Sequence, residues 1–267
     1  LGNYIFGNFS GLKQNIFGKL HLLLSKYYNF FLGFRFKLSK ELNLLKRNGY
    51  VVFAADRLNN KILIDELNKK ISKNIPKKRS NNIFILPNDK LLKEKELISS
   101  LIEKKVSDLL EAYYGGGYKI SSASFRYTFF PGYKKETEQY SDYWHFDSSP
   151  SSTLSVFVLL SNTTEKNGPM EMLNSENSKN IVRMGYTSRR KKEFWNLINK
   201  NPEVEKFTGV KGSILISKVS SCLHRATFPN PGKSRKMLVI SVFPVFGKSD
   251  KTSFKESWIY KLTHKKT

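Results

Sequence analysis

The chain has 267 residues, 39% of them hydrophobic and 13% aromatic, which suffices for one large domain with a buried core and excludes a globally disordered chain. Its 46 lysine and arginine residues against 22 aspartate and glutamate residues give a net charge of +24, which favours anionic partners. Because the lysines are scattered rather than gathered into one stripe, we assign most of this charge to compositional bias and expect no nucleic-acid partner.

The single cysteine, Cys222, excludes an internal disulfide and any zinc site built from several cysteines. A lone cysteine suits a reducing compartment. The sequence shows no signal peptide with a small-residue cleavage site and no apolar run long enough to span a bilayer. These features predict a cytoplasmic protein.

Residues 1–37 are expected to form an N-terminal amphipathic helical segment. Lysines lie between apolar residues at helical spacing, namely Ile5, Phe9, Leu12, Ile16, Leu20, Leu23, Tyr27, Phe30 and Phe34. A basic amphipathic helix can lie on a membrane surface. More often such a stripe packs against its own domain, and we favour packing, with peripheral membrane contact as the alternative.

Residues 38–250 are expected to form a single domain that begins with helices. Ser39 is a predicted N-cap for a short helix that ends at Gly49, and "YVVF" at 50–53 then reads as a buried strand. The stretches 57–72 and 88–114 follow as further predicted helices.

The second half of the domain has the pattern of short strands separated by Gly, Pro, Asn and Ser. The predicted strands are 122–130, the region around His145, 153–161, 168–173, 212–217 and 235–243. Helices followed by such a cluster predict an α+β fold whose strands close into a double-sheet barrel or jelly roll. A helical insertion is expected over 174–209, and a basic C-terminal tail over 251–267.

The stretch "DYWHFDSSP" at 142–150 suggests a metal site. On a strand, residues two apart point to the same side, so His145 and Asp147 are predicted to project together. A third ligand is needed. His21 falls in the N-terminal helix and His264 in the tail, which leaves His224. Two histidines and one carboxylate form the facial set that leaves open positions on non-haem Fe(II).

Arg235 opens a predicted strand just after a turn and is a candidate to bind an acidic co-substrate. A guanidinium grips a carboxylate through two parallel hydrogen bonds, which lysine does not match. Ser241 and Ser155 are possible hydroxyl partners of the co-substrate, and Tyr127 is a weaker candidate. The alternative is that Arg235 caps a hairpin at the surface.

Several motifs together resemble one known family. The stretches "NGYVVF", "WHFD", "LLSNTTEKNGPMEML", "GSILIS" and "LHRATFPNPGKSRKMLVISVF" are similar to the phytanoyl-CoA dioxygenase family of Fe(II)/2-oxoglutarate-dependent oxygenases. The resemblance covers residues 40–60 and 120–245. It implies a double-stranded β-helix (jelly-roll) core flanked by helices. It also implies that His145, Asp147 and His224 bind iron and that Arg235 binds the distal carboxylate of 2-oxoglutarate.

The resemblance further implies an activity. With Fe(II), 2-oxoglutarate and O2, the family hydroxylates a substrate and converts 2-oxoglutarate to succinate. Asp147 speaks against halogenation, because similar halogenases carry a small residue there. The stretches 172–177 and 178–209 depart from the family pattern, which leaves the substrate open; the basic surface hints at an anionic or acyl- or lipid-linked small molecule. The alternatives are a metal-free jelly-roll binding protein and a basic protein that binds membranes or nucleic acid.

Overall fold

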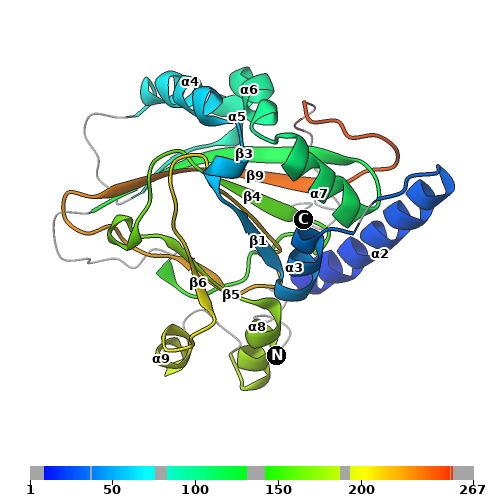
Figure 1. Cartoon of the computed structure of the whole chain (residues 1–267). Coiled ribbons are helices and arrows are strands. Elements are labelled where there is room, and N and C mark those ends of the chain that lie inside the picture. Colours follow the sequence, from blue (N-terminus) through cyan, green and yellow to red (C-terminus); the bar gives the residue numbers. More distant parts are fainter. Residues whose placement is uncertain are drawn as a thin grey trace.

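In the computed structural model, which describes residues 9–36, 38–75, 83–130, 142–186, 193–252 and 254, two antiparallel sheets form the centre of the molecule (Figure 1). The larger sheet has the strand order β1-β7-β4-β9-β3-β2, and the smaller has the order β6-β5-β8. The strands are β1 (Tyr50–Phe53), β2 (Ile83–Leu86), β3 (Tyr118–Phe129), β4 (Leu154–Leu159), β5 (Met170–Leu173), β6 (Val204–Phe207), β7 (Ile214–Ser217), β8 (His224–Ala226) and β9 (Ser234–Pro244).

Helices flank the sheets, as the predicted α+β jelly roll requires. The first helices are α2 (Phe9–Phe31), α3 (Lys40–Asn48), α4 (Lys61–Ser72), α5 (Asn88–Leu91), α6 (Lys95–Ser100) and α7 (Lys104–Tyr114). Figure 1 shows α4 to α7 over one side of the larger sheet. Two more helices, α8 (Ser175–Arg183) and α9 (Glu193–Asn199), lie near the smaller sheet. The predicted fold class is therefore confirmed.

The central strands are apolar on both faces because each face packs against a different layer. On β4, Val156 and Val158 belong to the core shared with the helices, while Phe157 and Leu159 belong to the core between the two sheets. Strand β9 alternates in the same way. The face of β9 that carries Met237 therefore looks toward the smaller sheet.

The predicted α3–β1 unit is confirmed. The Ser39 side chain accepts a hydrogen bond from the Leu42 amide at 3.0 Å, which caps the start of α3. Gly49 ends the helix with φ at 85°, and its amide donates to the Leu45 carbonyl. A Cβ at Gly49 would also collide with Ser175 and Cys222, so both the backbone conformation and the available space require glycine.

The predicted insertion at 174–209 is not wholly helical. It holds α8 and α9, but Val204–Phe207 form β6, which pairs with β5. Only Phe207 of this strand is buried, so the charged edge residues obscured the strand pattern. The middle of this segment (187–192), residues 1–8 and most of the expected tail (255–267) lie outside the described residues.

Helix α2 packs with the opposite side to the one we favoured. The stripe residues Ile16, Leu20, Leu23, Tyr27 and Phe30 are 45–66% exposed. The side that faces the domain carries instead three buried polar residues, His21, Ser25 and Asn29. The prediction that the apolar stripe packs on the domain is therefore wrong, because hydrogen-bonding groups on the domain select the polar side of the helix.

Burial of His21 predicts an acid-sensitive step in stability. Burial lowers the pKa of His21 to about 4 from an ordinary value of 6.5, and its ring lies 6.5 Å from that of Phe243. Because the folded-state pKa is lowered, this contribution to stability is complete above pH 6.5 and is lost as the pH falls toward 4. Between pH 7 and 4.5 we expect the parent to lose about 2 kcal/mol more unfolding free energy than His21→Leu. Urea titrations at both pH values measure this difference, and equal losses would contradict it.

Candidate active site

Three side chains from two segments converge at one end of the smaller sheet. One ligand atom from each of His145, Asp147 and His224 lies within 4.8 Å of the other two. The Nε2 atoms of His145 and His224 lie 3.4 and 3.5 Å from Oδ1 of Asp147. The two imidazole centroids are 4.4 Å apart. The three predicted metal ligands therefore do come together.

The route by which they converge differs from the prediction. His145 lies in no strand; it exchanges two backbone hydrogen bonds of 3.0 Å with His224 in one isolated bridge. The Asp147 amide then donates to the carbonyl of Val219 at 3.1 Å. After His145 the chain no longer pairs with β8, because the next backbone hydrogen bond, from Asp147, goes to Val219 in the loop before β8. Anchoring to two segments, rather than strand alternation, places Asp147 beside His145.

Backbone carbonyls fix the orientation of both imidazoles. Nδ1 of His145 is 2.6 Å from the Tyr143 carbonyl, and Nδ1 of His224 is 3.0 Å from the Cys222 carbonyl. A carbonyl oxygen only accepts hydrogen bonds, so each neutral imidazole carries its proton on Nδ1. Nε2 then presents its lone pair toward Asp147. Metal-binding histidines are commonly held in this way.

The charge state of Asp147 also suits a metal. Burial alone would raise the pKa of this carboxyl, but when the imidazoles carry protons on both nitrogens, the charge of His224 and hydrogen bonds from both rings hold the pKa well below its ordinary range. A metal cation bound at the Nε2 atoms would favour the ionised carboxylate in the same way. Bonds of about 2.1 Å to one ion would place neighbouring ligand atoms about 3.0–3.4 Å apart. The two histidine-to-carboxylate separations, 3.4 and 3.5 Å, need little adjustment, and all three ligand atoms lie within 4.8 Å of one another. These residues therefore fit a divalent metal ion.

Arg235 lines the same pocket and is only 2% exposed. Within the part of the chain that the structure describes, no protein group accepts a hydrogen bond from its Nε or Nη1. Burial lowers the pKa of Arg235 to about 10, and the charge of Arg126 contributes to the shift. The alternative of a surface hairpin cap is wrong. A buried guanidinium with unused donors favours an anionic ligand.

Strand register gives Arg235 neighbours that sequence reasoning missed. Thr128 on β3 lies directly opposite Arg235, and Arg126 lies opposite Met237. Both β3 side chains line the pocket, and Thr128 is 2% exposed, with no described hydrogen-bond partner for its hydroxyl. Pairing the two strands in this register would have identified them, but the sequence does not give the register.

The other three predicted co-substrate residues do not line the pocket. Tyr127 lies opposite Lys236 and packs on the helix side of the sheet, with the Lys236 Nζ 5.4 Å from its ring centroid. Ser155 and Ser241 lie opposite each other. Ser241 is six residues from Arg235, which corresponds to about 20 Å along the strand. The pocket therefore gives these three assignments no support, and they stay predictions.

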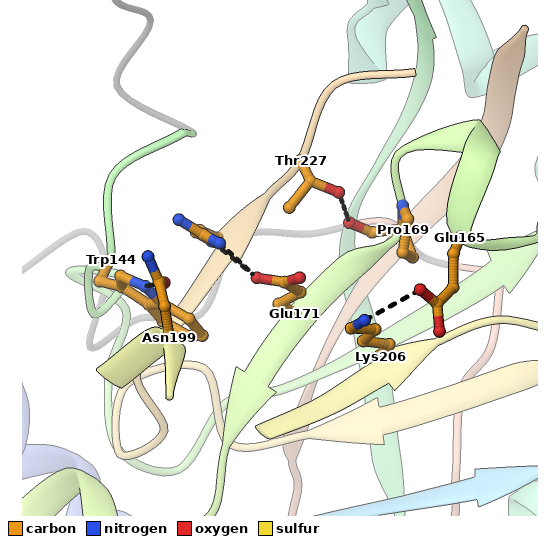
Figure 2. Close-up of polar contacts among 8 residues, drawn as sticks. Trp144, Glu165, Pro169, Glu171, Asn199, Lys206 and Thr227 are labelled. Carbon is orange, nitrogen blue, oxygen red and sulfur yellow. Dashed lines mark hydrogen bonds and ion pairs between the residues drawn. The ribbon is translucent and has the colours of Figure 1, made fainter. Parts of the chain in front are cut away.

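Polar contacts brace the strands beneath the pocket. Arg225, the residue after His224, lines the pocket and is held by Glu171 of β5, with Nε and Nη2 at 2.8 and 2.7 Å from Oε2. Farther along the same strand pair, the Thr227 hydroxyl donates to the Pro169 carbonyl at 2.7 Å. Figure 2 shows both Glu171 and this contact. The β5–β8 pair is thereby fixed at the position that presents His224.

Trp144 and Cys222 support the site without reaching the ligand atoms. Trp144 is fully buried in a small core beside α9, and its Nε1 donates to Asn199 at 2.9 Å (Figure 2). Burial raises the pKa of the Cys222 thiol to about 11, and its sulfur lies 3.3 Å from the Ser175 hydroxyl. The thiol is therefore protonated at neutral pH. Cys222 serves the site through its carbonyl, which holds His224.

Similar solved structures identify the fold. No protein-family model and no curated protein matches the chain. EctD from S. alaskensis with bound Fe is 14% identical, with a TM-score of 0.57 over 86% of this chain and 85% of that one. SnoN, a non-heme alpha ketoglutarate dependent epimerase from nogalamycin biosynthesis, is 12% identical, with 0.56 over 76% and 82%. HygX from Streptomyces hygroscopicus, with nickel, 2-oxoglutarate and hygromycin B bound, is 10% identical, with 0.54 over 79% and 89%. The chain shares the fold of these proteins.

Proposed function

We propose that the chain is an Fe(II)- and 2-oxoglutarate-dependent oxygenase that hydroxylates a small molecule. One observation carries the proposal: a single pocket holds the His145–Asp147–His224 set and a buried Arg235 with unused hydrogen-bond donors. A ligand that satisfies both groups needs a metal-chelating end and an anionic end. 2-Oxoglutarate has both, and structures of the same fold bind it together with a metal.

The electrostatics of the pocket favour this co-substrate. Burying the Arg235 guanidinium without an anionic partner costs roughly several kcal/mol of desolvation free energy, as it does for other unpaired buried charges. A carboxylate at Arg235 offsets that cost through charge-assisted hydrogen bonds, to which the Thr128 hydroxyl adds a further donor. Arg126 contributes a second positive charge nearby. The keto-acid end is then available to the metal.

Each group of the site has a defined task. His145 and His224 present Nε2 to the metal because carbonyls hold their Nδ1 protons, and ionised Asp147 offsets part of the metal charge. Bound iron with 2-oxoglutarate and O2 supplies the oxidising power that hydroxylates a C–H bond and yields succinate and CO2. Apolar side chains also line the pocket and would exclude water from it, namely Phe157, Met170, Met237 and Val239.

The proposal extends to a small-molecule substrate. Other crystals of this fold contain hygromycin B or 5-hydroxyectoine, both small molecules. Arg225 lines the pocket and is already paired with the carboxylate of Glu171. Its positive charge therefore does not require a negatively charged substrate.

Anaerobic spectroscopy tests the proposal. Adding Fe(II) and 2-oxoglutarate to the metal-free protein should produce a visible charge-transfer band, because a keto acid chelated to Fe(II) absorbs there. Succinate in place of 2-oxoglutarate lacks the keto group and should give no band. On admission of O2, the band should bleach and succinate should form. A protein that binds iron but never gives the band contradicts the oxygenase proposal, and one that binds no iron favours a metal-free binding protein.

A further inference from the structure

Helix α2 presents a broad apolar face to solvent. At 3.6 residues per turn, the exposed apolar side chains fall within about 160° of the helix circumference. We call this surface the outer face of α2; its members are 39–68% exposed and are Ile16, Phe17, Leu20, Leu23, Leu24, Tyr27, Tyr28, Phe30 and Phe31. Contiguous apolar surfaces of this kind mark interaction sites.

The opposite side of α2 is fixed to the domain by polar contacts. Ser25 Oγ and Asn29 Nδ2 donate to the Val245 carbonyl at 3.1 and 3.2 Å, and the Gly247 amide donates to Asn29 Oδ1 at 2.8 Å. Asn29 fits closely against Gly116, where any side chain would collide with it. The helix is therefore held with its apolar face outward, and Figure 1 shows α2 at the periphery of the molecule.

Positive charge borders the outer face. Lys19 and Lys26 follow one edge of it, and Lys19 is exposed. The Nζ atoms of Lys26 and Lys218 lie 5.5 and 5.2 Å from the centroid of the same ring, that of Tyr113. Burial, followed by repulsion from Lys46, lowers the pKa of Lys26. Lysines from α2, from α3 and from the loop after β7 thus lie beside the apolar face. The net charge of the whole chain is +24.

We propose that the outer face of α2 docks on an anionic lipid bilayer. Its apolar side chains would enter the boundary between headgroups and acyl chains, while Lys19, Lys26 and Lys218 would meet anionic headgroups. No helix in the described ranges has the length and apolar character needed to cross a bilayer, so the helix lies along the surface. The strong positive charge opposes pairing of two copies through this face. This inference does not depend on the proposed oxygenase function.

Vesicle flotation of the full chain tests the proposal. We expect binding to vesicles of phosphatidylcholine and phosphatidylserine at 7:3 that high salt weakens, and weaker binding to phosphatidylcholine alone that salt does not weaken. The variant Leu23→Glu/Tyr27→Glu/Phe31→Glu should bind at least tenfold more weakly. The control Ile62→Glu/Met184→Glu/Val210→Glu makes the same charge change at exposed apolar positions away from α2 and should bind nearly as the parent does.

Three outcomes would overturn the proposal. In the first, the parent chain binds neither kind of vesicle. In the second, both triple variants lose vesicle binding to the same extent. In the third, the parent self-associates without binding vesicles, and the α2 variant abolishes that self-association. The last result would assign the face to a second copy. Circular dichroism verifies that each variant is folded, and Leu23→Glu alone, at a 65% exposed position, provides the same comparison if the triple variant does not fold.

Discussion

Replacing Arg235 by leucine is expected to weaken 2-oxoglutarate binding by at least a hundredfold while leaving the metal-free protein as stable as the parent. The first effect follows because removing one partner of a buried charge pair costs about 3–5 kcal/mol. The second follows because the free protein buries this guanidinium with two unused donors, so a shorter apolar side chain removes that desolvation cost. Titration of the charge-transfer band and thermal melting without ligands measure the two effects.

Matched variants separate the role of Arg235 from a loss of charge. Lys236→Leu removes one positive charge from the next residue of β9, whose side chain lies on the opposite face against Tyr127, and should bind 2-oxoglutarate as the parent does. Arg235→Lys keeps the charge but loses the planar two-donor contact, so we expect an intermediate affinity. Thr128→Val, which removes one hydroxyl, should weaken binding about tenfold. If Arg235→Leu destabilises the metal-free protein and leaves co-substrate affinity unchanged, Arg235 is a structural residue and the pocket assignment is wrong.

Local signals in the sequence predicted the parts of the fold that depend on neighbouring residues. The Ser39 cap, the Gly49 stop and the strand at 50–53 are all set by contacts within a few residues, and the structure has them at the predicted positions. The apolar runs of β4, β7 and β9 also predicted strands, because strands buried on both faces contain few polar residues.

Most features that could not be predicted from the sequence depend on contacts between residues far apart in the chain, such as the register of paired strands. Tyr127 lies on the predicted strand before the His-x-Asp pair, but the β3–β9 register turns it to the helix side and brings Thr128 opposite Arg235. Likewise, the hydrophobic spacing in α2 indicated a helix correctly but not which side faces the domain. That choice depends on acceptors such as the Val245 carbonyl, more than 200 residues away in the sequence.

The convergence of the metal ligands combines both kinds of information. The choice of His145, Asp147 and His224 came from residue chemistry and from the resemblance of the surrounding motifs. Their geometry comes from the bridge between His145 and His224 and from the Asp147–Val219 hydrogen bond, neither of which has a local sequence signal. The candidate ligands could therefore be chosen from the sequence, whereas the loop that orients Asp147 could not be predicted from it.

Removing one ligand from this set should abolish the response of the protein to iron. Under anaerobic conditions, Fe(II) should raise the melting temperature of the parent, because a ligand that binds only the folded state stabilises it in proportion to the logarithm of its concentration over Kd. His224→Ala leaves two ligand atoms, and Asp147→Asn keeps the side-chain shape but removes the charge that offsets the metal. Both variants should lose the Fe(II)-dependent shift and the charge-transfer band.

A control carboxylate tests whether this loss is specific to the site. Asp108→Asn makes the same chemical change at an exposed position on α7, where the carboxylate pairs with Lys104, and should retain the full response to Fe(II). The reciprocal hydrogen bonds between the backbones of His145 and His224 do not involve either side chain, so His224→Ala should keep the bridge and the fold. A folded His224→Ala protein that still gains the parent's Fe(II)-dependent shift would show that the metal binds elsewhere, and the assignment of the three ligands would then fail.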